Sequence, residues 1–354
     1  MRPAACHVTR AICASLLPAA LMFALPATLP AQTEVRDWEV PYLTLRDRTD
    51  AEDPRDIYGS ERSHLKAGWC RVRELDLSVL SPLADSAPSF MREEFLRVDQ
   101  VREDDSAVVL DALQSTATAG APLVYVHGYN ISFEKGCRRA VSLQQNANLG
   151  GHFLWFSWPS DGALAYYTHD EADLYWSVPD LADAIIEMER RFGGGVVDIV
   201  GHSLGARGVV LALYDVANRH PDIRLDEIVL LAPDMDFGIF QRILPRISPI
   251  AENVTVYVTT GDRPLALSAQ LHGYPRLGEA GNDVSKLAGV EVIDLSDLPA
   301  DSPTGHLYHI YSEDVGDDLS QLLNEGKRAP ARKNLVRSGR NIWRLQQADQ
   351  PIQD

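Results

Sequence analysis

The chain has 354 residues, of which 45% are hydrophobic and 23% charged, and its formal net charge is -17 from 33 Lys and Arg against 50 Asp and Glu. This length and composition fit one large packed fold and exclude a collagen-like, wholly disordered or polytopic membrane protein. The acidic excess repels phosphate backbones, so nucleic acid is not an expected partner, and the cysteines lack the Cys-x-x-Cys spacing of a structural zinc site.

Residues 1–31 have the layout of a secretory signal peptide. Arg2 and Arg10 precede the apolar run 11–25, and small residues then lead to Gln32. Prolines interrupt the run and leave it short of the roughly 20 apolar residues that a membrane span needs. We therefore expect cleavage near Gln32 and an exported, periplasmic or secreted, mature protein. An uncleaved N-terminal anchor is the alternative.

Residues 32–120 are predicted to form a strand-rich N-terminal extension packed on the sheet of the domain that follows. Short strands are expected at 40–45 and 69–74, before a polar and weakly periodic stretch. Cys70 in this extension and Cys137 further along are the cysteines that remain after signal cleavage. They either pair in an oxidising compartment or stay as buried free thiols.

Residues 121–325 alternate short apolar runs with helical segments, which is typical of a parallel βαβ sheet. The expected strands are 123–127, 153–157, 196–200, 227–232, 254–259 and 290–295, and the expected helices are 131–148, 178–191, 204–219, 237–247 and 309–324. Several runs are apolar throughout, as in strands buried on both faces. The pattern predicts an α/β fold with a mostly parallel central sheet flanked by helices, and a site at the carboxyl ends of the strands.

Residues 326–354 are predicted to be a basic C-terminal tail. Between Lys327 and Arg344 the chain has seven basic residues and no acidic ones. Such a segment makes peripheral contact with an anionic membrane surface, docks on the acidic body of the protein, or stays solvated and partly disordered. Of these, we expect a solvated and partly disordered tail.

The candidate nucleophile is Ser203 in Gly201-His202-Ser203-Leu204-Gly205, which follows the strand 196–200 and precedes a helical segment. A G-x-S-x-G motif between a strand and a helix is typical of a nucleophile elbow, where a sharp turn lifts the serine hydroxyl above the sheet edge. The alternative is a structural turn with an inert serine. His202 is expected to pack under the turn.

An activated serine also needs preorganised donors for the oxyanion. The turn after the strand 123–127, His127-Gly128-Tyr129-Asn130, can present backbone N–H groups. The N–H of Tyr129 is expected to complete an oxyanion hole with the N–H of Leu204 at the helix N-terminus, with Asn130 as the neighbouring alternative. His127 is expected to position this loop.

The acid and the base are expected after the serine in the chain. Asp262 follows the strand 254–259 at a carboxyl end, where a carboxylate can orient an imidazole. His306 lies in the loop after the last predicted strand, behind a glycine that lets the loop dip toward the serine. The alternatives are Asp234 and Asp236 for the acid, and His309 and His272 for the base.

These motifs together resemble a bacterial family of alpha/beta hydrolases of unknown function. The matching stretches are Y-V-H-G-Y-N-I-S-F-E at 125–134, F-S-W-P-S-D-G at 156–162, G-H-S-L-G-A-R at 201–207, L-A-P-D-M-D at 231–236, Gly305-His306 and, upstream, 42–46 through 58–62. The similarity covers roughly residues 40–315. It implies the α/β-hydrolase fold and a serine hydrolase site on Ser203, Asp262 and His306, without naming a substrate.

We therefore expect an exported serine hydrolase that cleaves a carboxylic ester, either a small molecule or lipid-like, through an acyl-enzyme intermediate and without a metal or organic cofactor. The alternatives are an amidase or peptidase with the same triad, and a non-catalytic envelope binding or scaffold protein. A group of aromatic residues lines an apolar acyl pocket or belongs to the core: Trp155, Trp158, Tyr166, Tyr167, Tyr175 and Trp176.

Overall fold

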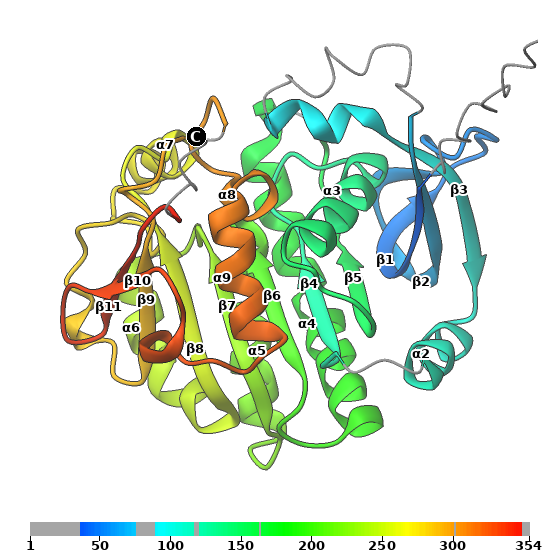
Figure 1. Cartoon of the computed structure of the whole chain (residues 1–354). Coiled ribbons are helices and arrows are strands. Elements are labelled where there is room, and N and C mark those ends of the chain that lie inside the picture. The colour runs from blue at the N-terminus through cyan, green and yellow to red at the C-terminus, as the bar shows by residue number, and fades with distance from the viewer. Residues whose placement is uncertain (1–35, 76–88, 117–119, 163, 301, 349–354) are drawn as a thin grey trace, which may run out of the picture. The chain divides into compact units, whose positions relative to one another are not determined.

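The computed structural model describes residues 36–75, 89–116, 120–162, 164–300 and 302–348, so the predicted signal peptide lies outside the described residues. These residues form an 11-stranded sheet in the order β10-β11-β9-β8-β7-β6-β4-β5-β1-β2-β3, with helices on both faces (Figure 1). None of the described helices is long and apolar enough to cross a membrane.

The central parallel strands form where the sequence has short runs that are apolar throughout. They are β4 (Leu123–Val126), β5 (Phe153–Ser157), β6 (Asp198–His202), β7 (Leu225–Leu231), β8 (Ala251–Val258) and β9 (Val290–Asp294). Successive side chains of a strand point to opposite faces, so Val124 and Val126 enter one apolar core while Leu123 and Tyr125 enter the other. The predicted α/β fold is confirmed.

The helices are divided between the two cores. One face is covered by α2 (Ser106–Ser115), α4 (Tyr167–Phe192), α5 (Leu204–Arg219) and α6 (Phe237–Ile247), and the other by α3 (Phe133–Asn146), α8 (Tyr308–Tyr311) and α9 (Glu313–Leu323). The helix α7 (Arg263–His272) follows β8. Short 3-10 turns are η2 (Ser89–Phe95), η3 (Leu164–Tyr166), η4 (Ser248–Ile250), η5 (Val284–Lys286) and η6 (Ala329–Ala331).

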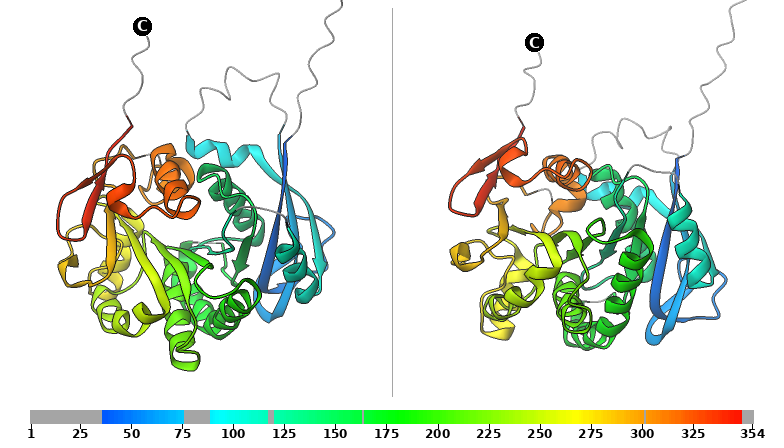
Figure 2. Two further views of the ribbon diagram at one scale, coloured as in Figure 1. Left: turned by 60° about the horizontal axis from the view of Figure 1, so that its bottom comes forward. Right: turned by 90° about the horizontal axis from the view of Figure 1, so that it is seen from below.

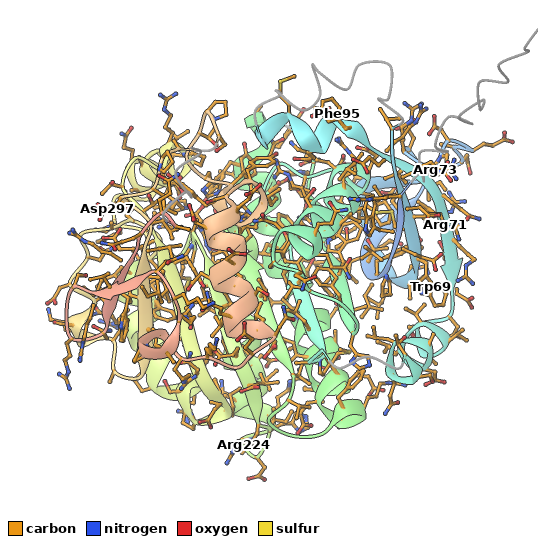
Figure 3. The ribbon with its side chains drawn as sticks, viewed as in Figure 1. Trp69, Arg71, Arg73, Phe95, Arg224 and Asp297 are labelled. Atoms are coloured by element: carbon orange, nitrogen blue, oxygen red, sulfur yellow. A yellow bond between two sulfur atoms is a disulfide. The ribbon has the colours of Figure 1, made fainter. Side chains whose placement is uncertain are left out.

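The N-terminal extension lengthens the sheet, whereas the sequence predicted that it packs on the sheet. Its strands are β1 (Asp37–Arg48), β2 (Tyr58–Glu74) and β3 (Leu96–Asp104). Strand β1 pairs in parallel with β5 and antiparallel with β2, and β2 pairs antiparallel with β3. Alternate residues of β2 share a face, and Figure 3 labels Trp69, Arg71 and Arg73 along the strand.

A disulfide joins Cys70 of β2 to Cys137 of α3, with a Cα–Cα distance of 6.5 Å. Both residues are fully buried. Of the two states that the sequence left open, the structure therefore contains the paired one. The bond ties the added strands to a helix that packs on the parallel part of the sheet.

The basic C-terminal segment is also part of the sheet. Strand β11 (Ile342–Leu345) pairs in parallel with β9, and β10 (Leu335–Arg337) pairs antiparallel with β11. Arg332 pairs with Asp318 at 2.8 Å, and Arg328 pairs with Glu227 at 2.8 Å. The expectation of a solvated, partly disordered tail is therefore wrong for residues 327–348, because its strands join the sheet and its arginines form ion pairs with carboxylates of the acidic body. Figure 2 shows β10–β11 and β1–β3 at opposite edges of the sheet.

The strand order reverses direction at β4. Strand β4 has β5 on one side and β6 on the other, and from β6 to β9 the chain then continues away from β5. In open parallel sheets a ligand site lies at the carboxyl ends of the strands beside such a switch point. Figure 3 labels Arg224, which precedes β7, and Asp297, which follows β9, at opposite ends of the strands. The loops after β4 and β6 meet at the carboxyl end.

Candidate active site

Ser203 occupies the turn between β6 and α5, with φ 53° and ψ -121°. A non-glycine residue in this region is strained, and such strain gathers at functional sites. The two flanking glycines make the turn possible. A Cβ on Gly201 would lie 2.7 Å from the Cα of Ala206, and a Cβ on Gly205 would lie 2.1 Å from the carbonyl oxygen of His127. The G-x-S-x-G spacing is therefore required by close backbone packing.

His306 and Asp262 form a buried pair. The Nδ1 of His306 donates to Oδ2 of Asp262 at 2.6 Å, and both residues are less than a tenth exposed. The other oxygen of Asp262 accepts the N–H of Leu265 at 3.0 Å, which caps α7. The N–H of Arg263 donates to the carbonyl oxygen of Thr304 at 3.2 Å, so the two loops are joined by the backbone as well.

The loop that carries His306 also contacts the nucleophile turn. His202, next to Ser203, donates from Nε2 to the carbonyl oxygen of His306 at 3.2 Å, and the two rings are 4.7 Å apart. Within the described residues no hydrogen bond joins the Ser203 hydroxyl to the His306 ring. Catalytic contacts of this kind are often long without substrate. Because Nδ1 of His306 donates to Asp262, its Nε2 is the ring nitrogen that can accept a proton.

The loop after β4 runs directly against Ser203. A Cβ on Gly128 would lie 3.0 Å from the Cβ of Ser203 and 2.8 Å from Nδ1 of His202. On the other side of the serine, the N–H of Leu204 belongs to the first turn of α5, where a helix leaves its amides without intrahelical partners. The structure thus brings the two expected sources of oxyanion donors to the same serine.

The two candidate amides of this loop, those of Tyr129 and Asn130, differ in their contacts. The N–H of Asn130 donates to Oδ2 of Asp170 at 3.1 Å, so it is engaged away from the serine. Tyr129 precedes it in the loop, and its ring packs edge-on against Tyr167 with centroids 5.2 Å apart. The amide of Asn130 is therefore committed to a carboxylate, and the Tyr129 amide stays the predicted oxyanion donor.

Asp170 and Arg46 hold these loops, and the sequence pattern predicted a role for neither. Asp170 is fully buried and accepts the Ser160 hydroxyl at 2.5 Å; burial raises the pKa of this carboxyl. Arg46 at the end of β1 donates to the carbonyl oxygen of Ile131 at 2.6 Å and of Ser160 at 3.0 Å. Burial lowers the pKa of Arg46 to about 10. Arg46 could have been predicted from the sequence, because it directly follows the apolar strand expected at 40–45. No sequence pattern marks Asp170.

His127 supports the loop from below. Its ring is fully buried and stacks on Trp158 with centroids 5.0 Å apart, and its Nδ1 donates to the carbonyl oxygen of Gly128 at 2.8 Å. Trp158 in turn donates to the carbonyl oxygen of His127 at 2.8 Å. Burial lowers the pKa of His127 to about 3, so the ring stays neutral. These contacts suit a residue that positions the loop.

The alternative acids make other contacts. Asp234 accepts from Nε of Arg276 at 2.7 Å and lies 3.3 Å from Arg207, inside a buried ion-pair network. Burial opposes the ionisation of Asp234, but the two arginines hold its pKa below the usual range. Asp236 caps α6 through the N–H of Ile239 at 2.8 Å. Among the described residues neither carboxylate pairs with a histidine.

The alternative base His309 lies in α8, almost fully buried, with its ring 4.2 Å from that of His202. Burial lowers its pKa well below the ordinary value. No carboxylate of the described chain orients it as Asp262 orients His306.

The aromatic residues that were predicted to line a pocket or the core fall into two groups. Trp155 and Trp158 are fully buried in the core, whereas Tyr166, Tyr175 and Trp176 are exposed.

Asp161, His169 and Asp173 are the described residues whose ligand atoms could hold a metal ion, all within 4.8 Å of one another. Ion pairs already account for them: Nδ1 of His169 lies 2.7 Å from Asp161, and Arg62 lies 2.5 Å from Asp173. The group lies in the loop before α4 and in its first half. A metal there is not needed to explain the cluster.

Two cavities border this region of the fold. One of about 990 Å³ lies among β1, η2, α3, α8 and α9, with Trp38, Glu93 and Tyr311 in its lining, and does not reach Ser203 or Asp262. The other, beside His306 and His309, holds about 10 Å³, which is room for one water. Neither cavity forms an enclosed acyl pocket at Ser203.

The similarity to solved structures is distant. The lin2722 gene product of Listeria innocua has 13% identity over 64% of this chain and 99% of its own, with a TM-score of 0.38. Est1E from Butyrivibrio proteoclasticus has 12% identity over 59% and 90%, with a TM-score of 0.38. An esterase of Pyrobaculum calidifontis has 13% identity over 82% and 84%, with a TM-score of 0.35. Scores this low carry no conclusion about activity, and no curated protein matches the sequence.

The family described as alpha/beta hydrolase of unknown function (DUF900) matches residues 103–325. That range begins after β2 and includes β4, the nucleophile turn, Asp262 and His306. It covers more than half of the chain and contains the parallel strands β4 to β9. The chain therefore belongs to the alpha/beta hydrolases of unknown function.

Proposed function

We propose that this protein is an exported serine hydrolase that cleaves carboxylic esters through an acyl-enzyme intermediate. The observation that carries the proposal is the buried His306–Asp262 pair, whose loop is bonded to the turn that holds Ser203 at positive φ. A nucleophile, a base and an acid that orients the base are the parts that acyl transfer by a serine requires.

The first half of the reaction acylates the enzyme. The Ser203 hydroxyl attacks the ester carbonyl while Nε2 of His306 takes its proton, and Asp262 stabilises the imidazolium through Nδ1. The tetrahedral oxyanion accepts hydrogen bonds from the amides of Leu204 and Tyr129. Collapse expels the alcohol, which takes the proton from His306, and leaves Ser203 acylated.

The second half regenerates the serine. Water gives a proton to Nε2 of His306 and attacks the acyl carbonyl, and the same amides hold the second oxyanion. Collapse returns the proton to Ser203 and releases the carboxylic acid. We favour esters because they are the easiest acyl transfer for these groups; amides would use the same residues, so a substrate panel separates the two.

The disulfide supports the export part of the proposal. Bonds between buried cysteines persist in oxidising compartments and are rare where cellular reductants keep thiols reduced. Cys70 and Cys137 are paired and fully buried. A signal peptide at residues 1–31 agrees with a mature chain that folds outside the cytoplasm.

The deciding experiment is active-site labelling. The purified chain is treated with a fluorophosphonate and assayed on short p-nitrophenyl esters, beside a Ser203→Ala variant. We expect labelling and ester hydrolysis in the wild-type protein and neither in the variant. A matched Ser177→Ala variant, in α4, controls for the loss of a buried hydroxyl outside the nucleophile turn and the oxyanion loop. Hydrolysis that survives Ser203→Ala would show that the serine is not the nucleophile, and an unlabelled, inactive wild type would favour a binding or scaffold role.

A further inference from the structure

The three most exposed large apolar side chains among the described residues lie on one short segment. They are Leu267 (58% exposed) and Leu271 (63%) on α7, and Tyr274 (66%) just after its C-cap. The spacing of four residues puts the two leucines on one face of the helix, and Tyr274 follows the C-cap Gly273. Buried positions of α7 are Leu265 and Ser268 on the opposite side. The helix therefore presents an apolar stripe to the outside, which is unusual for a protein face without a partner.

The charge of the two neighbouring helices has the opposite sign to that of the whole chain. The segments of α6 and α7 contain no Asp or Glu, whereas the chain as a whole has a formal charge of -17. Arg263 opens α7, and Arg242 and Arg246 lie on the exposed face of α6 together with Ile239, which is 49% exposed. None of these three arginines is ion-paired within the described part of the chain.

The helix that carries the stripe begins at the candidate active site. Asp262, which pairs with His306, is the N-cap of α7. At the other end of the helix the N–H of Phe237, the first residue of α6, donates to the carbonyl oxygen of Pro275 at 3.1 Å. Figure 1 shows α7 at the end of the sheet where β8 ends. A surface bound by α7 would thus lie on the helix whose first turn holds the His306–Asp262 pair.

We propose that the exposed face of α7, with the adjoining start of α6, docks on a lipid bilayer that contains anionic headgroups. Apolar side chains enter the boundary between headgroups and acyl chains, and unpaired arginines attract the anionic headgroups, as on helices that lie in the plane of a membrane surface. An acidic protein surface is repelled by such a bilayer, so the acid-free helices are the face that fits it. We name this face, Arg242, Ile239, Arg263, Leu267, Leu271 and Tyr274, the docking face.

The inference rests on the proposed function for its consequence, because docking beside a serine hydrolase site delivers an ester from the lipid phase. It adds a second candidate surface for membrane contact beside the basic tail, of which Arg328 and Arg332 are engaged with carboxylates of the body. The substrate class would then be esters with an acyl chain that partitions into a bilayer.

The experiment compares vesicle binding by the full-length wild-type chain with that of a Leu267→Ser/Leu271→Ser variant. Vesicles of phosphatidylcholine alone, and of phosphatidylcholine with a quarter of phosphatidylglycerol, are sedimented with each protein. A Val108→Ser/Val336→Ser variant is the matched control, because those valines are 48% and 47% exposed on α2 and β10. Hydrolysis of a water-soluble p-nitrophenyl ester is measured for each protein, together with its state of association by sedimentation velocity.

We expect the leucine variant to lose vesicle partitioning by about tenfold or more, since each exposed leucine removed takes apolar area out of the interface. The valine variant should bind as the wild type does, and all three should hydrolyse the water-soluble ester equally. Wild-type binding should be tighter with phosphatidylglycerol and weaker in high salt. An Arg242→Gln variant should lose this preference in part.

Equal vesicle binding by the leucine variant and the wild type overturns the proposal, because attachment then comes from another segment. A wild-type dimer that the leucine substitutions dissociate also overturns it, because the face then covers a second copy. Failure of the proposed function has a different signature: no hydrolysis of the water-soluble ester by the wild type, with vesicle binding still lost in the leucine variant. A Ser203→Ala variant should bind vesicles like the wild type.

Discussion

The ring of His202 is bonded to the backbone of His306: its Nε2 donates to that carbonyl oxygen at 3.2 Å, so the residue beside Ser203 holds the loop that carries His306. We expect His202→Phe to lower kcat on p-nitrophenyl esters by roughly 10- to 100-fold, since small displacements of a catalytic group cost about this much. KM should change little. His202→Gln keeps a donor and should recover part of the loss. Equal activity of the two variants would contradict this positioning role.

Asp262 orients His306 and caps α7, and the two roles can be separated by substitution. Asp262→Asn keeps a capping oxygen but cannot stabilise the imidazolium, so kcat should fall by about 10³- to 10⁴-fold while the melting temperature changes little. Asp236→Asn is the matched control, because Asp236 caps α6 in the same way without a histidine partner. Steady-state kinetics measure the change in kcat, and circular dichroism measures the melting temperature. A fall in kcat of less than tenfold in Asp262→Asn would show that Asp262 is not the acid that orients the base.

Gly205 packs against the backbone of the oxyanion loop. A Cβ there would lie 2.1 Å from the carbonyl oxygen of His127. That oxygen belongs to the backbone of a closely packed region, so it cannot shift without a large cost in stability. Gly205→Ala should lower the free energy of unfolding by about 1–3 kcal/mol or more and abolish activity. Gly150→Ala, where a Cβ meets nothing within 4 Å, is the control. Urea unfolding tests this, and equal midpoints for the two variants would contradict the close approach.

The sequence predicts the site well where the chemistry is local. Ser203, its two glycines and the helix behind it form one continuous motif. The helix α5 matches the predicted helix 204–219, and β6 begins two residues after the start of the predicted strand 196–200. Asp262 and His306 could be proposed from chain order and strand ends, but their pairing brings together residues 44 positions apart and is visible only in the structure. Asp170 could not be found at all, because its partners Asn130 and Ser160 come from other loops.

The fold is less predictable at its edges than at its centre. Buried parallel strands such as β4 show continuous apolar runs, whereas β2 extends over 17 residues with polar side chains on its open face, which hides most of its length. Pro179 and the aromatic first half of α4 likewise conceal a helix of 26 residues. The exposed leucines of α7 remove the period that marks an amphipathic helix, so α7 was not predicted.

The Cys70–Cys137 bond closes a loop with a sequence separation of 67 residues. In the chain-entropy account, a loop of this size stabilises the folded state by about 4 kcal/mol. We therefore expect the Cys70→Ala/Cys137→Ala variant, or the reduced wild type, to unfold at a clearly lower urea concentration. Urea unfolding with and without dithiothreitol measures this. The double variant itself is the control for the reductant, and a midpoint shift caused by dithiothreitol in that variant would point to another cause.

His127 gives the fold a defined acid sensitivity. Its pKa is lowered by burial to about 3, whereas an unfolded histidine titrates near 6.5, so the unfolded chain binds more protons between these values. Stability from this group is therefore complete above pH 6.5 and decreases as the pH falls toward 3. Relative to His127→Gln, the wild type should lose about 1.4 kcal/mol per pH unit below pH 6.5. Urea titrations between pH 7.5 and 5 test this, and parallel curves for the two proteins would contradict it.

Strand β1 lies between β2 and β5, so a strand near the start of the described chain pairs with one more than 100 residues later, as Tyr42 does with Trp155. At the far edge, β11 lies among the last described residues and pairs with β9. Strand pairings between residues this distant in sequence must close large loops, and the chain entropy lost in closing them slows folding. Among the described strands, β11 is therefore the last that can join the sheet as the chain is synthesised, so this edge forms after all the others.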